Sequence, residues 1–341
     1  MRHEVKKVFI AGGTGFLGYY SALKFLETGA EVTTIALSKE VEIGDWFPKE
    51  INLSYGNLFE MTQNEIEDML RKDNYDTFIY ALGPDDRVLP NAPSLDFFYE
   101  KLVVQAKKIC SAAKAAGIKR CVIMNSYFSY FDRLYGGKLA KYHPYIKARG
   151  LQEKELSAMS ESNAFDIMFL ELPYIFGTMP NRKPLWRESF LSHFDRLPVI
   201  VFPFGGGTST IDVSGVAEAV VAAAINGEST EKYQIGKTNI LFKDLIKFML
   251  KCSNDKRKYI SLPAWLCGLG GLSIVRKNKR EGKEGGLHYG KLMTQIQNKK
   301  FFINPNEYQS KLGFKELGFC GGKDVFESIK ETMKECYPES F

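Results

Sequence analysis

Three glycines near the start of the chain have the spacing of a phosphate-binding turn. Gly12, Gly15 and Gly18 follow an apolar segment at 8–10 and precede a predicted helix over 19–28. Gly12 can form the tight turn, Gly15 lets backbone approach a pyrophosphate, and Gly18 lets the helix pack close to the strand. This order of strand, turn and helix predicts a dinucleotide site, and a turn without a ligand is the alternative.

A hydroxyl group follows a predicted strand at the place where α/β proteins bind their ligands. Ser126 comes directly after the strand 121–125 and lies four residues before Tyr130. Parallel sheets bind ligands at the carboxyl ends of their strands. We therefore expect Ser126 to hydrogen-bond a reacting oxygen, with a residue that only caps a turn as the alternative.

A tyrosine and an arginine are one helical turn apart further along the chain. Pro144 predicts a helix start, so Tyr145 and Arg149 share a face of that helix. A free phenol has a pKa near 10, and it needs a neighbouring cation to exchange protons at neutral pH. Arg149 can supply that charge, although an arginine does not readily pass a proton on. A buried structural tyrosine is the alternative for Tyr145.

These motifs resemble the extended form of the short-chain dehydrogenase/reductase superfamily, the group that includes the NAD-dependent epimerase/dehydratase family. The glycines follow its Gly-x-x-Gly-x-x-Gly pattern, and Pro144, Tyr145 and Glu153 match its Pro-Tyr-x-x-Ser-Lys-x-x-x-Glu pattern in register. Arg149 stands where that family has lysine. An arginine at this position keeps the positive charge beside Tyr145 but does not readily serve the family's proton relay. The resemblance as a whole extends over nearly the entire chain.

The resemblance implies a cofactor and a set of residues that would contact it. Residues 55–58 resemble the turn that holds the adenine, 78–83 the strand whose small end lies against the cofactor, and 172–177 the segment that packs the nicotinamide. The implied contacts are Gly12, Thr14, Gly15, Phe16, Leu17, Gly18, Asn57, Leu58, Ala81, Leu82, Gly83, Tyr145, Arg149, Pro173 and Ile175. The implied catalytic residues are Ser126, Tyr145 and Arg149.

The end of the second predicted strand bears on the choice of cofactor. An acidic residue there would bind the ribose 2′-hydroxyl of NAD, but Ala36 stands at that place. Ser38 and Lys39 follow and could bind a 2′-phosphate, which favours NADP over NAD. Lys39 as a solvated loop residue is the alternative.

Strand and helix patterns alternate through the first half of the chain. The strands are expected at 5–11, 31–37, 51–55, 77–82, 121–125 and 167–172, with a long helix at 101–117. This alternation predicts an α/β fold with a Rossmann-type doubly wound parallel sheet. We expect residues 1–176 to form the NAD(P)-binding domain, with some later segments returning to its sheet. Residues 177–341 would then form mainly a smaller α+β substrate lobe.

Composition narrows the classes of partner. The chain has 341 residues and a net charge of +6, and its basic residues lack the interleaved aromatic residues of a nucleic-acid-binding protein. Its apolar stretch 262–275 is too short to span a bilayer, so we expect a cytoplasmic protein without a transmembrane segment. The basic run 276–280 follows that stretch, which leaves contact with an anionic membrane as an alternative to a helix that caps the pocket. The six cysteines lack metal-site spacing, so no metal is expected.

The resemblance implies an NAD(P)-dependent oxidoreductase or epimerase-type enzyme that moves a hydride to or from a carbonyl or sugar substrate, with Tyr145 as acid or base. The aromatic residues of the second lobe favour a less polar carbonyl compound, and Glu171 would not help to bind a diphosphate. Basic residues of the second lobe could do so, with a solvated surface charge as the alternative for each: Arg182, Lys183, Arg187 and Arg196. A nucleotide-sugar epimerase or dehydratase with retained NAD is one alternative, and a catalytically weak NAD(P)-binding regulatory or assembly protein is another. Many members of the resembled family dimerise through a helix pair, so the resemblance also offers a homodimer through helices at 95–117 and 145–161.

Overall fold

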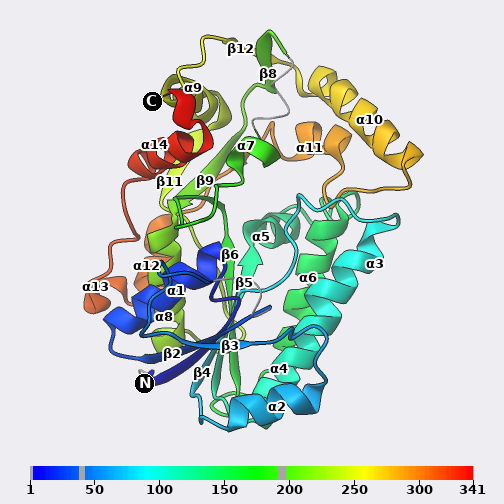
Figure 1. The fold of residues 1–341 in the computed structure, drawn as a ribbon. Coiled ribbons are helices and arrows are strands. Elements are labelled where there is room, and N and C mark those ends of the chain that lie inside the picture. The colour runs from blue at the N-terminus through cyan, green and yellow to red at the C-terminus, as the bar shows by residue number, and fades with distance from the viewer. Residues whose placement is uncertain (1–2, 38–42, 191–196, 341) are drawn as a thin grey trace.

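A seven-stranded parallel sheet forms the centre of the larger part of the molecule (Figure 1). The structure is a computed structural model that describes residues 3–37, 43–190 and 197–340. The strand order is β10-β6-β5-β4-β1-β2-β3, which confirms the predicted Rossmann-type sheet. The strands are β1 (Lys7–Ala11), β2 (Glu31–Ala36), β3 (Asn52–Tyr55), β4 (Thr77–Tyr80), β5 (Arg120–Ser126), β6 (Asp166–Leu172) and β10 (Lys232–Gln234).

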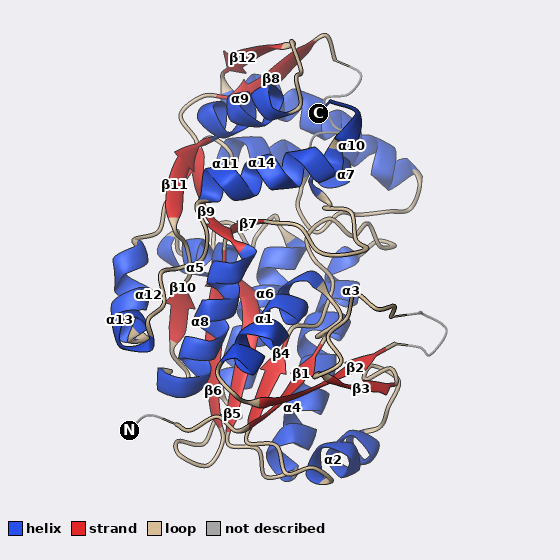
Figure 2. Ribbon diagram, turned by 60° about the vertical axis from the view of Figure 1, so that its left-hand side comes forward, coloured by secondary structure: helices blue, strands red, loops and turns tan. Residues whose placement is uncertain are grey.

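Helices cover both faces of this sheet (Figure 2). One face carries α1 (Phe16–Glu27) and α8 (Val213–Asn226). The other carries α2 (Gln63–Arg71), α3 (Ser94–Tyr99), the π-helical segment η1 (Glu100–Val104), α4 (Gln105–Ala115) and α6 (Pro144–Ser157). The predicted helix 101–117 is therefore η1 and α4 in sequence.

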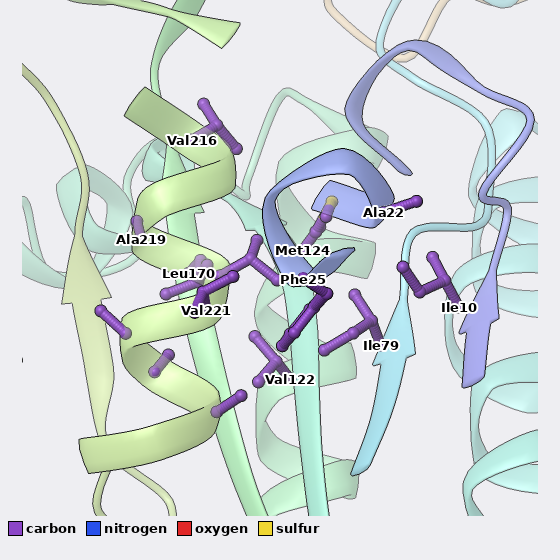
Figure 3. Close-up of a cluster of buried hydrophobic side chains, with 14 of the residues drawn as sticks. Ile10, Ala22, Phe25, Ile79, Val122, Met124, Leu170, Val216, Ala219 and Val221 are labelled. Atoms are coloured by element: carbon purple, nitrogen blue, oxygen red, sulfur yellow. The ribbon is translucent and has the colours of Figure 1, made fainter. Parts of the chain in front are cut away.

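Alternation along the strands divides the core between the two faces. Val8 and Ile10 of β1 pack towards α1 and α8, and Phe9 and Ala11 pack towards α2 and α4. Figure 3 shows the first of these clusters, in which side chains of β1, β4 and β5 lie against α1 and α8. Because both faces are covered, β5 is buried along its whole length.

A smaller lobe lies over the carboxyl ends of the strands (Figure 1). β9 (Gly207–Asp212) pairs in it with three strands, β7 (Tyr174–Phe176), β11 (Thr238–Leu241) and β13 (Lys300–Phe301), and β8 (Val199–Pro203) pairs with β12 (Lys258–Leu262). Its helices are α7 (Trp186–Ser189), α9 (Phe242–Cys252), α10 (Ala264–Arg280), α11 (Tyr289–Gln295), α14 (Val325–Cys336) and η3 (Pro338–Ser340). Within the described residues, no helix has both the length and the apolar content to cross a bilayer.

The chain returns from this lobe to the large sheet. β10 pairs with β6 at the edge of the sheet, and α8 covers one of its faces. Two short helices, α12 (Pro305–Lys311) and α13 (Phe314–Leu317), lie near β10 and α8 (Figure 2). α5 (Tyr127–Leu134) follows β5 directly, and its Phe131 stacks on Phe301 of β13 in the smaller lobe. The boundary at residue 176 stays a prediction.

Candidate functional site

A cleft of about 1670 Å³ lies between the carboxyl ends of the central strands and the smaller lobe. Every predicted cofactor-binding or catalytic residue that the structure describes lines this cleft, from the glycine turn to Ser126, Tyr145 and Arg149. Ser38 and Lys39, the residues proposed to bind a 2′-phosphate, lie outside the described residues, as does Arg196. A cleft at the carboxyl ends of parallel strands is where α/β proteins bind nucleotides.

The glycine turn holds the start of α1 against the end of β1. Gly12 has a φ of +94°, and a Cβ atom there would lie 2.6 Å from the carbonyl oxygen of Ala81. A Cβ atom on Gly18 would overlap the carbonyl oxygen of Gly12. Gly15 precedes α1, and no side chain caps the helix there. The amide groups of its first turn therefore have no side-chain acceptor, and the residues of this turn line the cleft. The turn therefore fits an anionic ligand.

A threonine from the neighbouring strand fixes the same turn. The backbone N–H of Gly13 donates to Oγ1 of Thr34 at 2.9 Å, and that hydroxyl donates to the carbonyl oxygen of Ile10 at 2.7 Å. The spacing of the glycines did not predict this role for Gly13, because the partner lies 21 residues away on β2.

An arginine from the smaller lobe lies over the glycine turn. Nη1 of Arg182 is 3.8 Å from the position that a Cβ atom of Gly15 would take. The sequence suggested Arg182 as a ligand for a substrate phosphate, but the structure places it beside the predicted dinucleotide turn instead. A guanidinium group beside the start of α1 can bind a pyrophosphate.

Ser126 lies at the junction of β5 and α5. Its hydroxyl oxygen accepts from the backbone N–H of Phe128 at 3.3 Å, so Ser126 caps α5 as well as lining the cleft. Asn125 next to it was not predicted as a site residue. Its side-chain amide donates to the carbonyl oxygen of Arg149 and to Oε1 of Gln152, both at 3.3 Å. Asn125 thereby ties the end of β5 to α6.

Tyr145 and Arg149 are paired on the first turns of α6. Nε of Arg149 donates to the phenol oxygen of Tyr145 at 3.0 Å. Nη1 of Arg149 donates to Oε1 of Gln152 at 2.9 Å and to the carbonyl oxygen of Met124 at 3.2 Å. Burial raises the pKa of Tyr145 and the charge of Arg149 opposes this, so the phenol keeps its proton at neutral pH. The same N–H stabilises a phenolate if the proton leaves.

The loop after β4 adds a carboxyl group that the sequence analysis did not select. Asp86 lines the cleft beyond Gly83, and Asp85 next to it forms an ion pair with Arg87. Burial, and then the negative charge of Asp85, raises the pKa of Asp86 to about 6. Asp86 and Tyr145 both line the cleft, and the charge of Asp86 in turn raises the pKa of Tyr145. Its position after a central strand was the available signal.

The part of the cleft beyond Tyr145 is lined mainly by aromatic and apolar side chains. Trp186 stacks on Phe176 at a ring distance of 4.3 Å and forms one wall together with Tyr174. Tyr289 of α11 and Leu266 of α10 also line this part.

Glu171, which the sequence suggested would not help to bind a diphosphate, is not among the residues that line the cleft. Its carboxylate is fully buried, where it accepts from Nη2 of Arg133 at 2.7 Å and from Nε2 of Gln234 at 2.6 Å. Its charge is therefore neutralised inside the core, and Glu171 does not contact a ligand in the cleft.

Comparisons with known proteins agree with this architecture. Solved structures with the same fold include gox2253, with a TM-score of 0.73 at 16% identity over 98% of each chain. A nucleoside-diphosphate-sugar epimerase from Pseudomonas aeruginosa gives 0.69 at 14% identity over 98% of each chain. The UDP-glucose 4-epimerase of Thermus thermophilus, in complex with NAD, gives 0.64 at 14% identity over 97% of this chain and 98% of its own. At these identities the likeness concerns the fold.

Sequence comparison defines the family. No curated protein sequence matches the chain. The sequence model of the NAD dependent epimerase/dehydratase family matches residues 8–236, which run from β1 to just beyond β10. This match covers more than half of the chain and includes the glycine turn, Ser126, Tyr145 and Arg149. The protein therefore belongs to the NAD dependent epimerase/dehydratase family.

Proposed function

We propose that this protein is an NAD(P)-dependent enzyme that transfers a hydride to or from the carbonyl or carbinol carbon of a small molecule. One observation carries the proposal. A buried phenol, Tyr145, accepts a hydrogen bond of 3.0 Å from the guanidinium of Arg149, in the same cleft as the glycine turn. A bound nicotinamide supplies or accepts the hydride in such enzymes. Side chains of the protein itself move the proton and hold the substrate and the cofactor in place.

Each group in the cleft has a proposed role. Tyr145 gives its proton to the substrate oxygen during reduction and takes a proton from it during oxidation. Ser126 hydrogen-bonds the same oxygen, and Arg149 stabilises the phenolate that forms at Tyr145. The glycine turn, the first amides of α1 and Arg182 hold the pyrophosphate. Asn57 and Leu58 contact the adenine, and Ala81–Gly83 with Pro173 and Ile175 line the nicotinamide.

The phenolate needs a source from which to regain its proton. An arginine side chain does not readily pass a proton on, so Arg149 cannot replace the lysine of the family pattern in this step. Asp86 lines the same cleft, and its raised pKa of about 6 leaves a protonated fraction near neutral pH. We assign Asp86 as the acid that returns the proton to Tyr145, directly or through a water molecule.

The lining of the cleft favours a weakly polar carbonyl substrate and NADP. Aromatic and apolar side chains such as Trp186, Tyr174 and Tyr289 surround the space beyond Tyr145. Ala36 ends β2 in the wall of the cleft, and no carboxylate stands at that position to bind a ribose 2′-hydroxyl. A nucleotide-sugar epimerase that retains NAD is the second candidate, because similar folds carry that activity and one of them holds NAD.

Deuterium transfer tests the proposal. The protein is incubated with 4-deuterated NADPH or NADH and a panel of aldehydes and ketones, and the products are analysed by mass spectrometry. We expect a deuterated alcohol, and we expect Tyr145→Phe to slow its formation by about 10²- to 10⁴-fold while cofactor binding is retained. Equal rates in the two proteins would contradict the role of Tyr145. Binding without transfer to any compound would favour a regulatory protein.

A further inference from the structure

Helix α10 stands between the cleft and the surface of the smaller lobe. One of its faces packs against α11 through glycines, where a Cβ atom on Gly271 would lie 2.6 Å from the carbonyl oxygen of Tyr289. A second face lines the cleft through Leu266, Gly270 and Ile274. Both of these faces are therefore explained by contacts within the protein.

The third face of α10 is exposed and carries two kinds of side chain. Trp265 is 62% exposed and Leu269 is 56% exposed, although both are large and apolar. Arg276 and Arg280 follow each of them by eleven residues, which is close to three turns of an α-helix. The two arginines therefore lie on the same face as the two apolar side chains, nearer the C-terminal end of the helix.

Neighbouring segments extend this surface. Phe204 is 59% exposed and Ile260 is 41% exposed, and the backbone N–H of Phe204 donates to the carbonyl oxygen of Leu262, two residues before α10. Lys277 and Lys279 add two exposed cations at the end of α10, which contains no Asp or Glu. We call Phe204, Ile260, Trp265, Leu269 and the cations of 276–280 the α10 surface.

We propose that the α10 surface binds an anionic lipid bilayer. Tryptophan and leucine on one exposed face, with arginine and lysine beside them, match the boundary between acyl chains and anionic headgroups. A second copy of α10 carries no Asp or Glu within the helix, so a symmetric contact between two α10 helices would offer these cations no opposite charge. Charge complementarity thus selects the bilayer as the occupant.

The position of the surface suggests how a substrate arrives. Leu266 lines the cleft and is also exposed, so the edge of the cleft borders the α10 surface. When the α10 surface lies on the bilayer, the apolar part of the cleft near Leu266 would open towards the lipid. A lipophilic carbonyl compound could then enter from the membrane. This second step rests on the proposed function, whereas binding to the bilayer does not.

Sedimentation with lipid vesicles tests the binding without any substrate. The full chain is mixed with vesicles of phosphatidylcholine alone or with added phosphatidylglycerol, at low and at high salt. We expect sedimentation only with the anionic vesicles and weaker binding in high salt. The double substitution Arg276→Gln with Arg280→Gln should weaken binding by about fivefold for each cation removed. Trp265→Ser with Leu269→Ser should abolish it.

Matched variants away from the surface serve as controls. Leu134→Ser changes an apolar side chain that is 60% exposed on α5, and Lys330→Gln with Lys334→Gln removes two exposed cations of α14. These variants should sediment like the wild type. Failure to bind anionic vesicles, or equal losses in the control variants, would overturn the proposal. A concentration-dependent dimer that only the Trp265 and Leu269 variant abolishes would also overturn it and would assign the face to a second copy.

Discussion

Arg149 is the residue at which this chain departs from the pattern of its family. Its guanidinium group donates to Tyr145, to Gln152 and to the carbonyl oxygen of Met124 at once. A charge alone would be replaceable by lysine, but a single ammonium group on a different stem does not reproduce this planar arrangement of donors. The geometry therefore indicates that Arg149 has a structural role in addition to its charge.

We predict that Arg149→Lys lowers the rate of hydride transfer more than about tenfold. The carbonyl oxygen of Met124 and Oε1 of Gln152 would each lose the bond from Arg149, although Gln152 keeps its bond from Asn125. This loss should also lower the free energy of unfolding by about 1–3 kcal/mol. Steady-state kinetics and denaturant unfolding measure the two effects, with exposed Lys147→Arg on the same helix as the control. Unchanged or faster turnover would show that Arg149 contributes only its charge.

Asp86 gives the proposed mechanism a pH dependence. The carboxyl group loses its proton as the pH rises through about 6, so the reduction rate should fall as the pH rises through that value. In a plot of rate against pH, Asp86→Asn should remove the fall in rate near pH 6. The same substitution should move the titration of Tyr145 to lower pH, because the charge of Asp86 raises the pKa of Tyr145. The pH dependence of kcat in the reducing direction measures both effects.

Asp85→Asn is a second variant that tests the same pH dependence. The charge of Asp85 raises the pKa of Asp86, so its removal should move the fall in rate to below pH 6 without abolishing it. A fall in rate near pH 6 that persists in Asp86→Asn would assign that titration to another group.

At the scale of elements, the start of α1 depends on contact between two glycines. A side chain on Gly18 would collide with the carbonyl oxygen of Gly12, so Gly18→Ala must push the helix away from β1. We expect weaker binding of the dinucleotide and a lower melting temperature. Gly150→Ala is the control, because nothing lies within 4 Å of its Cβ position in α6 and it should stabilise the protein by up to about 1 kcal/mol. Calorimetric binding and thermal unfolding measure these effects, and equal behaviour of the two variants would contradict the role of this contact.

Elements with strong local patterns were predictable from the sequence, and elements held by distant contacts were not. β1 and β5 are continuous apolar runs before glycine or polar residues, so their existence followed from pattern alone. β10 has three residues, Lys232–Gln234, and its place in the sheet depends on pairing with β6 across about sixty residues of chain. Similarly, the glycine spacing predicted the turn, whereas the Thr34 hydroxyl that fixes it comes from another strand.

The fold of the whole molecule places the predicted dinucleotide turn and the proposed catalytic residues in one cleft. The glycine turn and Tyr145 are more than a hundred residues apart, and the parallel sheet brings both to the carboxyl ends of its strands. The resemblance predicted that convergence for the large domain. The contributions of the smaller lobe were less predictable, because Arg182 and Tyr289 lie in segments without a strong motif and reach the cleft only through tertiary packing.

The proposed function depends on the binding of a nicotinamide dinucleotide at the glycine turn of this cleft. Calorimetric titration of the protein with NADPH, NADP, NADH and NAD tests it most directly, after mass spectrometry has shown whether a cofactor copurifies. We predict exchangeable binding at one site per chain with a preference for the phosphorylated forms, and a thermal stabilisation of about 2.7 kcal/mol at a hundredfold excess over the dissociation constant. If none of the four dinucleotides binds and none copurifies, the proposed hydride transfer is wrong.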